Sequence, residues 1–205
     1  QPFFIYRISL GLLSQAGVIA LDWLQPSAAA VGAYAAAMGT AGLVAVLATA
    51  TNRTYARQLS ILLERRDFAT VLELRGERLR WLIPAIAVFL VIAFAFTHEL
   101  LALFRSEFMN EGVAPLRILA AATAFSVLFA LAPTYLKYRR RNRTTYLTVA
   151  CAAAAQGILL LLLVPRLGAT GAAIAYAVST CGMYGAFAWM AHRELALLKA
   201  DCDAP

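Results

Sequence analysis

Long uncharged runs alternate with short basic segments along this chain. Five runs carry no Asp, Glu, Lys or Arg, namely residues 23–52, 81–97, 118–136, 144–165 and 167–191. A bilayer core about 30 Å thick needs about 20 mostly apolar residues per helix, so each run can hold one crossing. A weaker sixth candidate, Phe3 to Leu21, is interrupted by Arg7. The pattern predicts an all-α membrane protein with six transmembrane helices at about 3–22, 28–51, 81–103, 113–136, 144–164 and 170–191.

The composition agrees with this class of protein. Apolar residues make up 62% of the 205 residues and charged residues only 14%, with a mean hydropathy of +0.72. Soluble domains contain about 45–50% apolar and about 25% charged residues, so a water-soluble globule is excluded. The charges, net +7, lie mostly between the apolar runs, which argues against nucleic acid as a partner. The expected partners are anionic lipid headgroups, contacted by Arg53, Arg65, Arg139, Arg140 and Arg141.

The distribution of basic residues predicts the orientation of the helices. Segments 53–80 and 137–143 and the stretch after the last helix hold fourteen Lys and Arg residues, whereas the other connections hold only Arg105 and Arg166. By the positive-inside rule, both termini and the two basic loops are expected in the cytoplasm. Apolar residues at near-helical spacing within 53–80 also predict a short interfacial helix there.

The inventory of reactive side chains is poor. Two histidines and three cysteines show no metal-ligand spacing, and no glycine-rich phosphate loop or nucleophile–base motif occurs. We therefore expect no enzyme activity, catalytic residue, metal site or cofactor. The chain opens at Gln1 directly into an apolar run, and we expect it to be preceded by the N-terminal part of a longer protein.

Prolines and small residues predict helix ends and helix contacts. Pro84 and Pro115 are expected near the first positions of the third and fourth helices, where proline costs little. Pro133 should kink the fourth helix and Pro165 should end the fifth. Gly171 should let the sixth helix approach a neighbour closely. Further contacts are expected at the small-residue stretches 28–33, 35–39, 120–122, 152–155 and 171–173 and at Gly182 and Gly185.

Four polar side chains within the predicted helices are candidates for substrate binding. Arg7 and Arg117 lie about one turn inside the first and fourth helices. Gln15 and Gln156 lie nearer the middle of the first and fifth helices. A cation inside a bilayer usually faces a cavity or a partner, and such groups suit an amphiphile with an anionic headgroup. Two alternatives stay open, because an arginine near a helix end can reach the membrane surface and a glutamine can hydrogen-bond a neighbouring helix.

Four short motifs resemble a known family. Residues 30–37 (AVGAYAAA), 104–108 (FRSEF), 114–120 (APLRILA) and 164–175 (VPRLGATGAAIA) are similar, in order and spacing, to segments in the C-terminal six helices of polysaccharide-biosynthesis flippases. These flippases belong to the multidrug/oligosaccharidyl-lipid/polysaccharide exporter superfamily. The resemblance covers nearly the whole chain.

The resemblance implies one half of a two-lobe transporter. The substrate path lies between the lobes, so this C-terminal lobe would need a missing N-terminal lobe. Members move undecaprenyl-diphosphate-linked oligosaccharide across the bacterial plasma (inner) membrane, which implies glycan polymerase and glycosyltransferases as further partners. Arg7 and Arg117 would hold the diphosphate. Gln15 and Gln156 would contact sugar hydroxyls. The chain carries Gly17 where many relatives have an acidic residue, which argues against ion coupling through the first helix.

Two other functions remain open. A cation-coupled drug exporter of the same superfamily would favour acidic cavity residues, and the predicted helices contain none away from their ends. A non-transporting membrane subunit of a polysaccharide synthase would offer the basic loops to its partner. A glycosyltransferase cluster beside the gene would favour the flippase over the drug exporter, and a stable separate product would favour the synthase subunit.

Overall fold

The chain is all-helical in the part that the computed structural model describes, which is residues 2–25, 27–65, 68–138 and 142–203. The predicted all-α class is confirmed. The elements are α1 (Pro2–Leu24), α2 (Ala28–Glu64), α3 (Phe68–Ala95), α4 (Thr97–Ala102), the 3-10 turn η1 (Ser106–Phe108), α5 (Met109–Leu128), α6 (Leu131–Tyr138) and α7 (Asn142–Asp203).

Several of these helices are long and apolar enough to cross a membrane. Among the described residues they are Ala28–Asn52 in α2, Glu73–Ala95 in α3, Glu111–Tyr138 over α5 and α6, and Arg143–Ala196 in α7. Helix α1 contributes a shorter apolar stretch, Leu10–Leu24. At 1.5 Å per residue, a 23-residue segment is about 35 Å long, enough for a hydrocarbon core of about 30 Å. These lengths and compositions agree with the membrane-spanning helices that the apolar runs predict.

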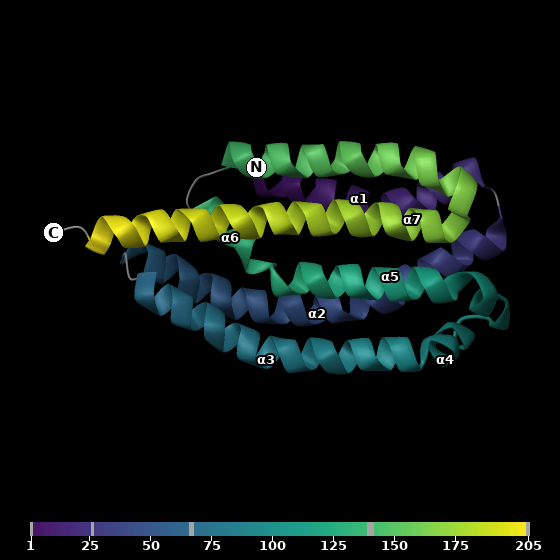
Figure 1. Ribbon diagram of the computed structural model, residues 1–205, viewed down its shortest axis with the longest axis horizontal. Coiled ribbons are helices and arrows are strands. Elements are labelled where there is room, and N and C mark those ends of the chain that lie inside the picture. Colours follow the sequence, from purple (N-terminus) through teal and green to yellow (C-terminus); the bar gives the residue numbers. More distant parts are fainter. Residues whose placement is uncertain (1, 26, 66–67, 139–141, 204–205) are drawn as a thin grey trace.

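Helix α7 folds back on itself at Gly168. This residue has φ 55° and ψ −132°, outside the helical region, and a side chain with a Cβ rarely adopts such a φ. Figure 1 shows the chain reversing there, so residues 142–167 and 169–203 form two antiparallel arms of α7. The fifth predicted helix therefore ends at Gly168, three residues beyond the expected Pro165, which lies inside the first arm.

The connections gather at two ends of the bundle (Figure 1). The α1–α2 connection, α4, η1 and the turn at Gly168 lie at one end, which we call the opposite end. The α2–α3 and α6–α7 connections and the last turns of α7 lie at the other end. We call this the basic end, because Arg57, Arg65, Arg75, Arg78 and Arg143 belong to the helix ends that meet there.

The segment 53–80 differs from the expected basic loop with one short interfacial helix. Helix α2 continues to Glu64, and α3 begins at Phe68. No Gly or Pro interrupts residues 53–65, and Arg, Leu, Gln and Glu favour helix. The charged segment therefore extends both long helices beyond their apolar parts. In the second expected loop, 137–143, helix α6 runs to Tyr138 and α7 begins at Asn142, while residues 139–141 lie outside the described residues.

The kink expected at Pro133 takes the form of a break in the fourth predicted helix. Helix α5 ends at Leu128 and α6 begins at Leu131, so the interruption falls at Phe129, four residues before the proline. Proline cannot donate to the carbonyl four residues earlier, and its ring crowds that carbonyl. The expectation for Pro84 and Pro115 is wrong, because α3 and α5 begin earlier and enclose both prolines.

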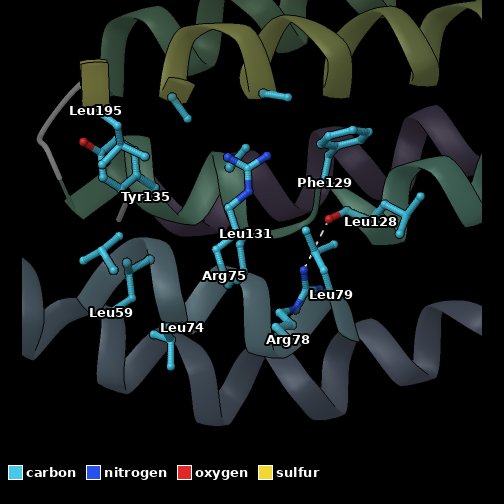
Figure 2. Close-up of a pocket in the computed structure, with 14 residues that line it drawn as sticks. Leu59, Leu74, Arg75, Arg78, Leu79, Leu128, Phe129, Leu131, Tyr135 and Leu195 are labelled. Atoms are coloured by element: carbon cyan, nitrogen blue, oxygen red, sulfur yellow. Dashed lines mark hydrogen bonds between the residues drawn. The ribbon is translucent and has the colours of Figure 1, made fainter. Parts of the chain in front are cut away.

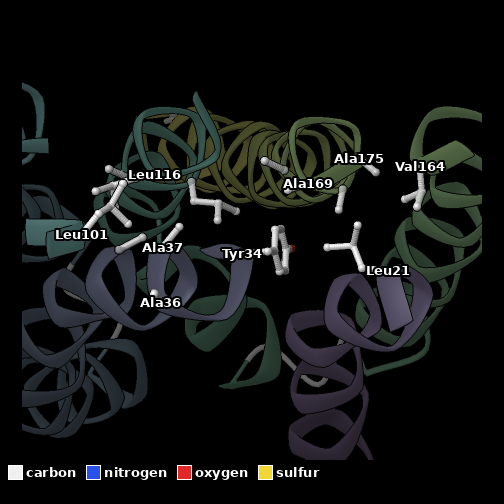
Figure 3. Packing of buried hydrophobic residues seen from close by; sticks show 14 of the residues in the cluster. Leu21, Tyr34, Ala36, Ala37, Leu101, Leu116, Val164, Ala169 and Ala175 are labelled. Carbon is white, nitrogen blue, oxygen red and sulfur yellow. The ribbon is translucent and has the colours of Figure 1, made fainter. Parts of the chain in front are cut away.

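The largest core lies where α1, α2, α5 and α7 meet, and small residues dominate it (Figure 3). All four sequence motifs contribute to it, through Tyr34, Phe108, Leu116 and Ala173 respectively. Figure 3 shows Tyr34 between Leu21 of α1 and the alanines of α7. Without a water-driven force between helices, close packing provides much of the association energy in a bilayer. These motif residues are therefore packing residues.

Two glycines make room for aromatic rings in this core. A Cβ on Gly17 would lie 2.6 Å from Cζ of Tyr34, and a Cβ on Gly32 would lie 2.6 Å from Cζ of Phe108. Real Cβ atoms do not approach carbon so closely. Gly17 therefore occupies a position where no larger side chain fits unless Tyr34 moves.

The close contact expected at Gly171 is confirmed. A Cβ there would lie 2.7 Å from the carbonyl carbon of Leu163, so the neighbour is the end of the first arm of α7. The same expectation is wrong for Gly182 and Gly185, where an added Cβ would meet no atom within 4 Å. It also fails at residues 153–155, which are exposed.

Candidate functional site

The four predicted site residues do not converge. Gln15 is exposed on α1, Gln156 is buried between α1 and the first arm of α7, and Arg117 is exposed on α5. The side chain of Arg7 lies outside the described residues, although its backbone belongs to α1. None of the described three contacts another by a hydrogen bond.

Gln156 joins two helices. Its side chain is only 1% exposed, and its Nε2 donates a 2.7 Å hydrogen bond to the carbonyl oxygen of Leu13. Its Oε1 is buried and accepts no hydrogen bond from the described residues. This geometry matches the interhelical hydrogen bond that the sequence left open for the glutamines.

Arg117 lies against the end of α3. Its Nη2 donates to the carbonyl oxygen of Phe94 and its Nε to Oγ1 of Thr97, both at 3.4 Å. The guanidinium carbon lies 5.9 Å from the centre of the Phe94 ring, within cation–π range. No carboxylate among the described residues pairs with Arg117, and its exposed edge remains accessible.

Arg78 is a buried cation that the sequence did not single out, because it falls in the expected loop. It is 2% exposed. Its Nη1 donates to the carbonyl oxygen of Leu128 at 3.3 Å, and its Nη2 donates to that of Val127 at 3.2 Å and to Oδ1 of Asn52 at 3.1 Å. Its Nε is buried without a described acceptor.

Helices α3 and α5 are antiparallel neighbours, and each sends one arginine to the C-terminal carbonyls of the other. Arg78 of α3 donates to the last carbonyls of α5, where Pro133 has broken the helix. Arg117 of α5 donates to Phe94, next to the last residue of α3. Carbonyls at a helix C-terminus lack helical partners and carry partial negative charge. Each cation thus lies at a helix end that stabilises it.

A pocket opens beside Arg78 at the basic end (Figure 2). It has a cavity volume of about 60 Å³, and none of the described residues that line it is acidic. In Figure 2 the Arg75 side chain extends from α3 into the pocket, whereas Arg78 turns toward the carbonyl of Leu128. The remaining walls come from α2, α3, the α5–α6 break and the second arm of α7, and they are Leu59, Val71, Leu74, Leu79, Leu128, Phe129, Leu131, Ala132, Tyr135, Ala188, Ala191 and Leu195.

A second, more polar cavity of about 390 Å³ lies at the opposite end. Gln25, Glu111, Arg166 and Thr170 line it beside the turn at Gly168. The Gln25 Oε1 would lie 2.7 Å from a Cβ on Gly168, so the glutamine closes over this turn. Exposed Arg166 and Glu111 give this cavity charges of both signs.

Comparison of the chain with protein-family models, with characterised proteins and with solved structures finds no match. Among the described residues, no cluster of three or more His, Cys, Asp or Glu side chains could hold a metal ion. The prominent polar features are cations within or beside apolar helices.

Proposed function

We propose that this chain is the C-terminal six-helix lobe of a flippase that moves undecaprenyl-diphosphate-linked oligosaccharide for cell-surface polysaccharide biosynthesis. The observation that carries the proposal is Arg117, an exposed cation on an apolar helix without a carboxylate partner among the described residues. An intramembrane cation of this kind suits a substrate whose headgroup is anionic and whose tail is hydrocarbon. The four motifs add the resemblance to the flippase family.

In the proposed topology, α1, α2, α3, the α5–α6 pair and the two arms of α7 are the six crossings. The basic end would face the cytoplasm of a bacterial plasma membrane, because Lys and Arg accumulate on that side. Both termini would then be cytoplasmic, and the missing N-terminal lobe would complete the transport path.

In the proposed mechanism, Arg117 holds the diphosphate while the prenyl tail remains in lipid. Arg7 belongs to the part of α1 nearer the basic end, so it would meet the diphosphate at a different step from Arg117. Arginine suits this role because its planar guanidinium donates two parallel hydrogen bonds to phosphate. Gln15 is exposed and can contact sugar hydroxyls. Gln156 has a packing role in this proposal, since its amide is buried against Leu13. The packing of Gly17 on Tyr34 leaves no space for an acidic side chain there, which disfavours the cation-coupled drug exporter.

The test is complementation of surface glycan in a flippase-deficient strain with the full-length gene. Arg117→Ala should reduce export at least about tenfold, the loss of roughly one charge-assisted hydrogen bond. Arg117→Lys should restore only part of it. Arg105→Ala is the matched control, because Arg105 is also exposed at this end but already has a carboxylate partner, Glu107, at 3.9 Å.

Protein levels and membrane insertion are measured alongside, since Arg117 also contacts the end of α3. Wild-type export by the inserted alanine variant would remove Arg117 from the substrate path. Full export by the lysine variant would show that only a point charge is needed there.

A further inference from the structure

The pocket at the basic end combines positive charge with an apolar wall. Arg75 and Arg78 lie three residues apart on α3, so their side chains leave the same face of the helix. Both line the pocket, and the part of the chain that the structure describes contributes no acidic side chain to its lining. An anion in this pocket would therefore be attracted by two positive charges, and no carboxylate among the described lining residues would repel it.

The two arginines differ in how many of their N–H donors already have an acceptor within the protein. Arg78 donates to Val127, Leu128 and Asn52. Arg75 is half-buried, points into the pocket, and no described residue accepts a hydrogen bond from it. Arg75 therefore has donors available for a ligand, while Arg78 contributes charge and holds the pocket wall in place.

The remaining lining indicates what else the ligand contains. Leucine, alanine and aromatic side chains from α2, α3, the α5–α6 break and the second arm of α7 form most of the wall, and such a surface suits hydrocarbon. A volume of about 60 Å³ accommodates only a few water-sized groups. The pocket can therefore take a phosphate group, and it is too small for a glycan.

We propose that this pocket binds the phosphate of an anionic lipid, with Arg75 as its direct ligand and the lipid chain leaving the pocket over its apolar wall. The lipid is a phospholipid of the surrounding leaflet or a prenyl phosphate, which share this chemistry. The site is separate from Arg117, which lies at the other end of α5, and it does not depend on the proposed transport activity.

The experiment measures lipid binding to the purified full-length protein in detergent by native mass spectrometry. The probes are phosphatidylglycerol, phosphatidylcholine, undecaprenyl phosphate and inorganic phosphate, each titrated separately. We expect retention of the anionic lipids over phosphatidylcholine. Arg75→Gln should weaken this retention about tenfold, as expected for the loss of a charge-assisted hydrogen bond.

Arg80→Gln is the matched control, because Arg80 lies on the same helix and is exposed away from the pocket lining. It should bind anionic lipid like the wild type. A second variant, Ala188→Phe, fills the pocket without changing its charge and should also weaken binding. Melting temperatures of all variants verify that they are folded.

The lipid that binds more tightly, phosphatidylglycerol or undecaprenyl phosphate, identifies the source of the phosphate, and either result supports the proposal. Equal binding by the wild type and Arg75→Gln would overturn it, as would binding of inorganic phosphate alone. Loss of lipid binding with normal glycan export would support this site while leaving the test of the flippase to Arg117.

Discussion

Arg78 and Arg117, which have no carboxylate partner among the described residues, are stabilised by backbone carbonyls. Arg78 is almost fully buried, yet its described partners are two carbonyls and one amide side chain and include no carboxylate. An unpaired charge in an apolar region is costly, and hydrogen bonds to a charged donor contribute about 1.5–3 kcal/mol each. Free carbonyls at a helix end supply such bonds without introducing a second charge. This explains how a basic residue is accommodated inside the bundle.

At Gly171, the absence of a side chain permits the tight reversal of α7. We expect Gly171→Leu to lower the melting temperature of the detergent-solubilised protein by about 3–10 °C, because overpacking costs about 1–3 kcal/mol. The physical reason is the backbone of Leu163, which cannot move aside as a side chain could. Gly182→Leu is the control, since an added Cβ meets nothing there. Equal melting temperatures for the two variants would contradict the contact.

The break between α5 and α6 is stabilised by a side chain from another helix, Arg78 of α3. Pro133 interrupts the helix, and the Leu128 carbonyl accepts a hydrogen bond from Arg78. The backbone N–H of Ala132 donates to Phe129 instead of continuing the α-helical pattern. Broken helices near the middle of membrane proteins commonly expose carbonyls that bind cations, and here the cation belongs to the protein itself.

A double-mutant cycle tests this coupling. Pro133→Ala should let α5 and α6 join, which returns the Val127 and Leu128 carbonyls to helical donors. Arg78→Gln should then destabilise the Pro133→Ala background by about 1 kcal/mol less than it destabilises the wild type. Chemical or thermal unfolding of the four proteins measures the difference. Additive effects would mean that Arg78 stabilises the bundle independently of the break.

At the scale of the whole molecule, the two ends of the bundle differ in how many basic residues they carry. The helix ends that meet at the basic end contain most of the arginines, whereas Arg105, Glu107, Glu111 and Arg166 lie at the opposite end. If the basic end faces the cytoplasm, the two ends must differ in their access to reagents that do not cross the membrane.

Cysteine labelling in intact cells distinguishes the two orientations. With Cys151, Cys181 and Cys202 replaced, Asn142→Cys should resist an impermeant thiol reagent and Arg105→Cys should react readily. Labelling after permeabilisation verifies that both cysteines are reactive. The reverse pattern would invert the proposed topology, and labelling of both in intact cells would contradict a membrane between them.

Much of the helical architecture follows from local sequence. Apolar runs of membrane-spanning length, the break at Pro133 and the close contact at Gly171 could all be predicted from the residues concerned. Such features depend on hydropathy and on local backbone chemistry, which a sequence displays directly. Helix lengths at the basic end were missed, because the positive charge of 53–80 indicates solvent access without indicating whether the backbone there is a loop or a helix.

The candidate sites depended on tertiary structure instead. The sequence indicates Gln156 and Arg117 as candidates only because they are polar residues in predicted helices. The packing of the helices places Gln156 against Leu13 and Arg117 against Phe94. It also brought Arg75 and Arg78 of α3 together with walls from α2, the α5–α6 break and the end of α7. Residues so far apart in the chain meet because helices pack side by side. Contacts across the bundle determine which face of each helix points toward its neighbours. Hydropathy along the sequence determines that a segment is a membrane helix, whereas the neighbours of each side chain are decided when the helices assemble.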